Sequence, residues 1–527
     1  MDREYIRVAR FCILRLCHAL TAMSLVACSG VEPAQAAVDH EVGDAITIYS
    51  TAAPGAISPE MYRPVAGRGQ YQSFALPGYA IVRHVRPIEL SRGRKEIRFT
   101  DVAALIDPTT VQFSSLTDPT GTRVTEQNFQ FDLVGTNKLI QRYIDREITI
   151  ERIIGDNLTT FTGTLLSATD GLILRDKDGQ IHAMRGYGNI RFPQLPGGLI
   201  TRPTLVWDIS ARRGGEHLTR VAYETKGMTW WADYNLVYAD GDNANEGFLD
   251  VGAWVSIINQ SGAGYENSRL KLIAGDVQRA TTPSSAGAMK SYARRELAMQ
   301  EGAAGFAEKS FFEFHLYTLE RRTSLPNNST KQIELFPAVR RIPARKLLVY
   351  YGLPQGYYPY YSSPVTDRNY GIETNKKVDT YLQFANEKRH GLGIPLPSGR
   401  IRVAKLDDAD GSLEFIGEDT IDHTPKDEKV LIRLGSAFDV VGERKQLDFQ
   451  VDSSQRWLEE EIEITLRNHK NEAVDVLVKE NLYRWVNWAI VSRTDNYEKQ
   501  DSRTIHFPVT VAKDGEKKVR YRVRYTW

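Results

Sequence analysis

The chain has 527 residues, of which 42% are apolar and 10% aromatic, enough to build about three to four domains around hydrophobic cores. It carries 67 basic and 66 acidic residues, and removing the four basic and three acidic residues of 1–36 leaves 63 of each sign. This balance lacks the basic footprint of a nucleic-acid-binding protein, so we expect no nucleic-acid partner.

The first 36 residues have the layout of a secretory signal peptide. A short apolar run over 16–28 follows four basic residues and precedes the small residues of 34–36; the basic residues are Arg3, Arg7, Arg10 and Arg15. The run is shorter than the roughly 20 residues of a membrane-spanning helix. We therefore expect cleavage after Ala36 and export to the periplasm or cell envelope.

All three cysteines lie in this first segment: Cys12, Cys17 and Cys28. Cleavage after Ala36 would leave no thiol for a disulfide or a metal site. Residues 25–28 (LVAC) also have the form of a lipoprotein cleavage box, in which Cys28 takes a lipid and becomes the mature N-terminus. Both alternatives stay open, and lipidation at Cys28 is the one link to a membrane that we expect.

Residues 45–195 predict two units. Alternating apolar and polar runs over 45–135 predict an N-terminal β domain. Residues 137–195 predict a helix over 137–145 and then about five short strands with glycine at the bends, an order that resembles a small SH3- or Sm-like barrel. This likeness is at the level of fold and carries no function.

Strict alternation predicts antiparallel strands with one buried face in two further domains, over 200–350 and 377–527. In the second, Ile462, Ile464 and Leu466 alternate with polar residues, and a polar turn and another alternating run follow over 468–479. The stretch 252–273 has the same order of strand, asparagine, turn and strand, which makes a weak internal repeat. We predict a mostly β protein with two immunoglobulin-like sandwiches.

Two segments interrupt the β pattern. Residues 277–309 are rich in Ala, Gly, Ser and charge, and predict a loop and then a short helical insertion near 286–308. Residues 351–376 predict a Tyr-rich loop, since tyrosine offers apolar area and a hydroxyl to a partner. The candidate binding residues there are Tyr357, Tyr358, Tyr360 and Tyr361. The alternative is that these rings pack on their own domain.

Five short motifs carry a resemblance to a known family: WD at 207–208, GMTWWADYN at 227–235, SGAGYEN at 261–267, LKLIAGDV at 270–277 and RNH at 467–469. They are similar to the domain of unknown function 4139, the main domain of exported bacterial proteins related to mucoidy inhibitor A. The strands over 82–108 resemble the N-terminal domain of that group. The family has no established activity, so the resemblance implies only a link to envelope or exopolysaccharide behaviour.

The search for catalytic motifs is mostly negative, because the chain has no GxSxG, HExxH, P-loop or GxGxxG. The best polar cluster lies over 418–428, where the candidate catalytic residues are Glu418, His423, Asp427 and Glu428. Carboxylates and histidine on one loop could do acid–base work. The alternative is a solvated loop between strands, and we expect neither a metal site nor a cofactor.

A second candidate site is Asp233 with its neighbouring tryptophans. In a strand, Trp231 and Asp233 share one face, while Trp230 and Tyr234 share the other. An aromatic ring beside a carboxylate is typical of sugar-binding sites, so Trp231 and Asp233 are candidate binding residues. The alternative is that tryptophan on a strand packs into a core.

The function that these patterns favour is a non-catalytic envelope protein whose β modules bind a polysaccharide, peptide or protein. The alternative is a secreted hydrolase that acts on an envelope polymer with the carboxylates and histidine near 418–428. The first is favoured because no catalytic constellation is visible in the sequence.

We predict that the mature chain begins at Ala37, or at a lipidated Cys28, because the two cleavage signals lie in tandem. Intact-mass measurement of envelope fractions distinguishes the two N-termini. A chain that keeps Met1 and stays in the cytoplasm would contradict export.

Overall fold

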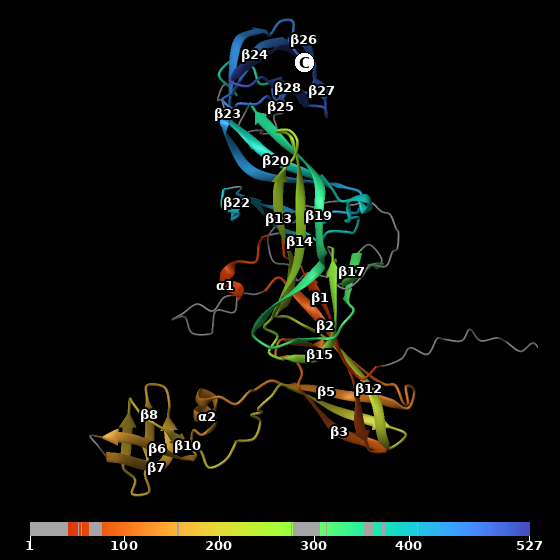
Figure 1. The fold of residues 1–527 in the computed structure, drawn as a ribbon. Coiled ribbons are helices and arrows are strands. Elements are labelled where there is room, and N and C mark those ends of the chain that lie inside the picture. Colours follow the sequence, from red (N-terminus) through yellow and green to blue (C-terminus); the bar gives the residue numbers. More distant parts are fainter. Residues whose placement is uncertain are drawn as a thin grey trace, which may run out of the picture. The chain divides into compact units, whose positions relative to one another are not determined.

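A computed structural model gives the fold (Figure 1). It describes residues 41–50, 52–53, 55–62, 76–154, 157–275, 277, 306–311, 314–352, 363–371, 375–407 and 409–527. Strands dominate the described chain, which confirms the mostly β prediction. The expected signal segment with Cys28, and the tyrosines Tyr357, Tyr358, Tyr360 and Tyr361, lie outside the described residues.

Helices are short wherever the chain is described. They are α1 (Pro59–Tyr62), α2 (Thr136–Arg142) and the 3-10 helix η1 (Lys388–His390). None of them combines the length and apolar character that crossing a membrane requires. Most of the expected helical insertion lies outside the described residues. Its last part was wrongly expected to be helical, because residues 306–308 begin strand β16, where Phe306 packs against a core.

The first sheet has eight strands, in the order β16-β17-β15-β1-β2-β12-β4, with β18 paired to β15. Its strands β1 and β15 are parallel, so the sheet is mixed rather than wholly antiparallel. Its bounds are β1 (Gly43–Ser50), β2 (Gly78–Leu90), β4 (Ile106–Ser115), β12 (Gly215–Thr225), β15 (Tyr265–Ala274), β16 (Phe306–Phe311), β17 (Phe314–Leu319) and β18 (Thr323–Leu325).

A three-stranded sheet joins β3 (Gly93–Thr100), β11 (Thr204–Ala211) and β5 (Thr122–Gln130). Strands β11 and β12 fall in the range that we assigned to the first sandwich, yet they pair with β2, β3, β4 and β5 of the N-terminal range. The small unit over 137–195 is therefore inserted between strands that share sheets, and the predicted boundary near 200 does not separate them.

The small unit is α2 followed by a five-stranded sheet in the order β10-β6-β7-β8-β9. Ile140 and Tyr143, on and just after α2, pack with the sheet's apolar residues in a core of their own. The sheet is not a closed barrel, which corrects that part of the prediction: β10 contributes only two residues, and both pair with β6. The strands are β6 (Glu147–Ile154), β7 (Asn157–Ser167), β8 (Leu172–Arg175), β9 (Ile181–Met184) and β10 (Ile190–Arg191).

The largest sheet has thirteen strands, with the main path β22-β21-β13-β14-β19-β20-β23-β24-β29-β26; β25, β27 and β28 pair off this path. Strands β13, β14 and β19 lie side by side (Figure 1). The bounds are β13 (Met228–Asp240), β14 (Glu246–Asn259), β19 (Ser329–Tyr351), β20 (Lys377–Ala385), β21 (Gly399–Leu406), β22 (Leu413–Ile421), β23 (Lys429–Asp452), β24 (Trp457–Asn468), β25 (Val474–Asn481), β26 (Trp488–Arg493), β27 (Glu498–Lys499), β28 (Thr504–Val511) and β29 (Gly515–Thr526).

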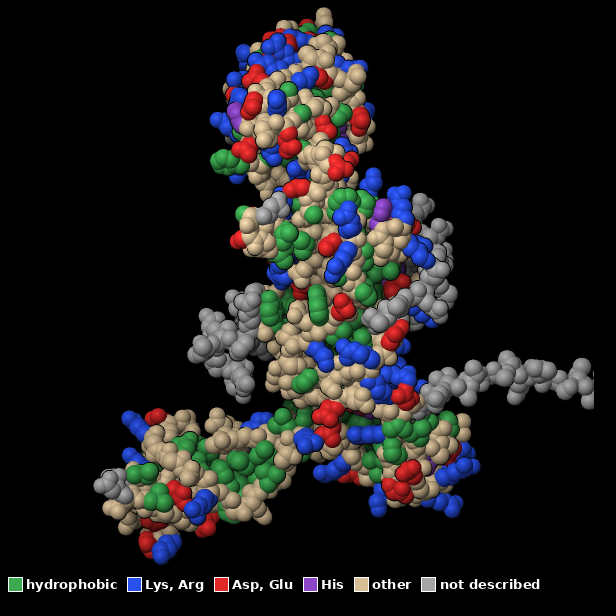
Figure 2. All heavy atoms as spheres, viewed as in Figure 1, with side chains coloured by type: hydrophobic (Ala, Val, Ile, Leu, Met, Phe, Trp, Pro, Cys, Tyr) green, Lys and Arg blue, Asp and Glu red, His purple; other side chains and the backbone are tan. Residues whose placement is uncertain are grey.

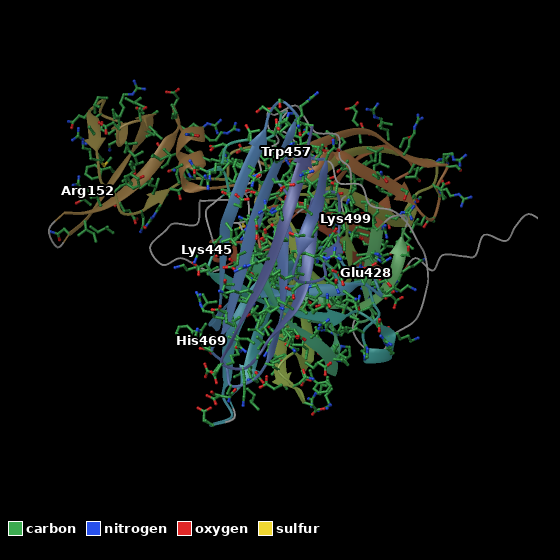
Figure 3. The ribbon with its side chains drawn as sticks, turned by 90° about the horizontal axis from the view of Figure 1, so that it is seen from above. Arg152, Glu428, Lys445, Trp457, His469 and Lys499 are labelled. Carbon is green, nitrogen blue, oxygen red and sulfur yellow. The ribbon has the colours of Figure 1, made fainter. Side chains whose placement is uncertain are left out.

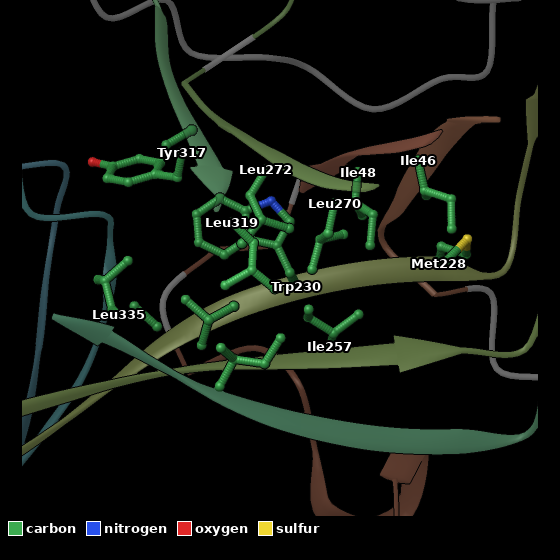
Figure 4. Close-up of a cluster of buried hydrophobic side chains, with 14 of the residues drawn as sticks. Ile46, Ile48, Met228, Trp230, Ile257, Leu270, Leu272, Tyr317, Leu319 and Leu335 are labelled. Carbon is green, nitrogen blue, oxygen red and sulfur yellow. The ribbon is translucent and has the colours of Figure 1, made fainter. Parts of the chain in front are cut away.

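The first core fills the space between the eight-stranded sheet and the start of the thirteen-stranded sheet (Figure 4). Ile46 and Ile48 of β1 and Leu270 and Leu272 of β15 face Trp230 of β13 there. This two-layered packing gives the region its β-sandwich character.

The second core is built from the C-terminal strands. Apolar residues of β24, β25 and β29 alternate inward as predicted, and Ile462, Ile464 and Leu466 are fully buried. Trp457 is the first residue of β24, and His469 directly follows its last residue (Figure 3). Long strands connect the cores: β23 gives Ile432 to the first and Val440 to the second. The range 351–376, where the sequence predicts a Tyr-rich loop, runs from the last residue of β19 to the residue before β20. These two strands pair with each other.

The internal repeat is supported by two buried asparagines, Asn259 and Asn468. Each side-chain Nδ2 donates to the carbonyl four residues on and to two carbonyls at the end of a distant strand, and each Oδ1 accepts the backbone N–H two residues on. The carbonyl partners are Ala263, Leu325 and Pro326 for Asn259, and Glu472, Val511 and Ala512 for Asn468. The same polar link therefore closes both units.

Buried ion pairs fix the chain that leads into β20. Arg444 and Arg484 are almost fully buried and pair with Glu480 and Glu460 at 2.9 and 2.8 Å. Their other N–H groups donate to backbone carbonyls of the segment 363–371; the acceptors are Val365, Asp367, Tyr370 and Gly371. Since an unpaired charge would be costly at this depth, the pairs and this segment stabilise each other.

We predict that Ile464→Asp unfolds the C-terminal strands, because it places an unpaired charge at a position with no solvent exposure. The loss should be about 4–5 kcal/mol or more, measured by thermal unfolding with circular dichroism. Phe438→Asp on β23, where the ring is 95% exposed, is the matched control and should unfold like the parent. Equal stability of the two variants would contradict the assigned core.

Candidate functional site

Strand β13 has two unlike faces. Trp230, Ala232 and Tyr234 point into the first core, while Trp231 on the other side is half-buried and faces outward. The prediction that Trp231 and Asp233 share a face opposite Trp230 is therefore confirmed. Trp230 packs into a core, as the alternative for a tryptophan on a strand predicted, whereas Trp231 lies on the outer face.

Asp233 lies at the base of that outer face, with its side chain only 9% exposed. Its Oδ2 accepts the indole N–H of Trp231 at 2.7 Å and the hydroxyl of Ser256 on β14 at 3.0 Å. The Ser256 hydroxyl in turn accepts from Gln332 of β19 at 3.0 Å. This chain of bonds across three strands fixes the carboxylate and orients the indole ring.

Two arginines of β21 join Asp233 to Glu418 of β22. The Oδ1 of Asp233 lies 3.6 Å from Nε of Arg400 and 3.7 Å from Nη1 of Arg402. Arg402 donates from Nε to Glu418 at 2.9 Å. The parallel pairing of β13 with β21 and the antiparallel pairing of β21 with β22 produce this row. One residue from each of the two predicted sites, Asp233 and Glu418, thus belongs to one cluster.

The cluster leaves polar atoms without hydrogen bonds. Asp233 Oδ1 and Arg400 Nε are both buried, and neither has a hydrogen-bond partner within the described chain. They attract each other as an ion pair, but their 3.6 Å separation is too long for a hydrogen bond. Buried atoms of this kind are normally satisfied by water or a ligand.

Aromatic rings flank the cluster. Trp254 of β14 lies directly opposite Asp233 in the strand register, and 41% of it is exposed. Tyr62 of α1 lies against Trp231 with 5.6 Å between ring centroids. We call these outward side chains the Asp233 face; its members are Trp231, Asp233, Trp254, Ser256, Gln332, Arg400, Arg402 and Glu418.

The other residues of the 418–428 candidate have separate partners. The ring of His423 accepts the backbone N–H of Ser398 at 3.0 Å. Asp427 and Glu428 make backbone hydrogen bonds to Asn386 on the turn after β20, and Glu428 is labelled in Figure 3. Over the described residues, no three His, Cys, Asp or Glu side chains are grouped as metal ligands.

Sequence reasoning missed the cationic half of the cluster and its second tryptophan. Arg400 and Arg402 alternate with the buried Ile401 and Val403, so the pattern marks them as outward-facing. Trp254 likewise alternates with buried residues. What the sequence does not show is that β21 pairs with β13, because that pairing joins distant segments.

The comparisons with known proteins give no family for the chain. It matches no family model, no curated protein and no solved structure. The resemblance to the domain of unknown function 4139 therefore stays a prediction from the sequence motifs.

We predict that Asp233→Ala lowers the free energy of unfolding by about 2–3 kcal/mol, because Trp231, Ser256 and the arginines lose a buried charged acceptor. Glu418→Ala removes the exposed end of the same cluster and should cost about 1 kcal/mol or less. Urea unfolding of both variants measures the difference, and equal losses would contradict the role of Asp233 as the buried anchor.

Proposed function

We propose that the protein is a non-catalytic binding protein of the cell envelope, and that its Asp233 face binds a neutral polysaccharide. The observation that carries the proposal is the pair of outward tryptophans beside a buried carboxylate–arginine cluster: Trp231 donates to Asp233, and Trp254 lies opposite Asp233 on β14. Aromatic side chains with exposed area are the usual anchors of binding surfaces.

The chemistry of this face suits sugars. The C–H faces of a sugar ring are apolar and pack on an indole, while its hydroxyls both donate and accept. Arg402 and Glu418 are about 40% exposed and offer donors and acceptors side by side. Asp233 acts as a positioning residue, since it holds the Trp231 ring and the arginines in place from below.

Charge favours a neutral ligand. The two carboxylates, Asp233 and Glu418, balance the two guanidinium groups of Arg400 and Arg402 within the cluster. Acidic and basic side chains are also interspersed over the molecular face drawn in Figure 2. An acidic polymer would meet no excess of positive charge at this face.

The hydrolase alternative has less support. Glu418 is engaged by Arg402 and the His423 ring accepts from the backbone of Ser398, whereas Asp427 and Glu428 bond to Asn386 through their backbones and their side chains are exposed. An acid–base pair needs two groups within reach of one reacting bond. The envelope location is supported by the signal-like segment 1–36 and by the family resemblance.

We predict that Trp254→Ala and Arg402→Met weaken binding of neutral envelope polysaccharides about tenfold or more, because each removes a direct contact. Affinity electrophoresis of the purified protein through gels that contain each polysaccharide measures the retention. Phe438→Ala, which removes an exposed ring on β23 outside the Asp233 face, is the matched control and should bind like the parent. Retention that survives both face substitutions, or that falls with the control, would contradict the proposal.

A further inference from the structure

A polar pocket lies on the core-facing side of the thirteen-stranded sheet, opposite the Asp233 face and at the end of the first core. It has a volume of about 250 Å³. Tyr238 and Leu382 of the first core, with Ile416 and Leu434 packed against that core, supply apolar lining. Its polar lining comes from Asp240, Lys346, Thr380, Lys405 and Ser436.

The pocket lies where long strands leave one core for the next. Strand β19 gives Ala344 to the first core and Leu348 to the second, and Lys346 lies between them. The register of β20 against β23 shifts beside Thr380, and Gly435 has a φ of 143°. Thr380 and Gly435 both line the pocket, so these irregularities of the sheet lie at its wall.

The charges in the pocket are unequally matched. Lys405 Nζ lies 2.5 Å from Asp240 Oδ2, so these two neutralise each other. Lys346 is half-buried, and its ammonium makes no hydrogen bond or ion pair with any described residue. Burial, and then the nearby charge of Lys470, hold the pKa of Lys346 below its ordinary value, although the carboxylates of Glu472 and Asp240 act in the opposite direction. A partly desolvated cation that no carboxylate contacts directly is costly unless an anion joins it.

We propose that this pocket binds a small organic monocarboxylate, with the carboxylate on Lys346 and the apolar body on Tyr238, Leu382 and Leu434. The ligand should carry a single negative charge because only one cation of the pocket lacks a paired carboxylate. It should have an apolar body because the floor belongs to the core. The hydroxyl of Thr380 offers a further hydrogen bond to the carboxylate.

Competitive acylation of the full chain tests the site. Lys346 is labelled with acetic anhydride, alone and with benzoate as the probe, and the labelling of each lysine is read by peptide mass spectrometry. Benzoate should reduce labelling of Lys346 about tenfold at saturation, and leave Lys331 unchanged. Lys331 is the control because it lies on the same strand with its ammonium on the Ser324 carbonyl.

Benzamide, the neutral isostere, and inorganic phosphate complete the test. Neither should protect Lys346 at the benzoate concentrations used. Calorimetry should show benzoate binding that Lys346→Met weakens at least about tenfold and Lys331→Met does not. Equal protection by benzamide would show an apolar cavity only. Protection by phosphate alone would show an inorganic anion site, and no protection by any probe would show no site. Each of these three results would overturn the proposal, and none depends on polysaccharide binding at the Asp233 face.

Discussion

The two-residue alternation of β13 determines which of its side chains build the first core and which build the Asp233 face. Because Trp230, Ala232 and Tyr234 fill the first core, Trp231 and Asp233 are forced onto the opposite face. A one-residue slip of β13 would exchange the two sets and lose both the core and the Asp233 face. The pairing of β13 with β14 and β21 then brings a second tryptophan and two arginines beside the carboxylate.

Polar links hold the strands in this register. Asn259 and Asn468 close equivalent turns in the two repeated units, and each satisfies carbonyls at the end of a strand far along the chain. The arginines of the buried Arg444–Glu480 and Arg484–Glu460 pairs likewise donate to backbone carbonyls of the segment 363–371, which leads into β20. Such links favour one arrangement over its competitors, because any other register would leave these groups buried and unpaired.

Local patterns were enough to predict a mostly β chain, and long-range pairing was not predictable from them. Alternation correctly placed Ile462, Ile464 and Leu466 in a core and put Trp231 opposite Trp230. It could not show that β11 and β12 complete sheets begun by the N-terminal strands, or that β10 is too short to close a barrel. Asp233 was found because an aromatic residue adjoins it in sequence, whereas its arginines and the Lys346 pocket arise from strands distant in sequence.

In the proposed complex, Trp231 and Trp254 contact a neutral polysaccharide. Fluorine NMR of the protein labelled with 5-fluorotryptophan reports each of its eight tryptophans separately once single Trp→Phe variants assign the signals. On addition of a polysaccharide that the protein retains, the account predicts shifts of the Trp231 and Trp254 signals, with the buried Trp207 unchanged. Shifts confined to Trp457, Trp485, Trp488 or Trp527, with Trp231 and Trp254 unmoved, would contradict it.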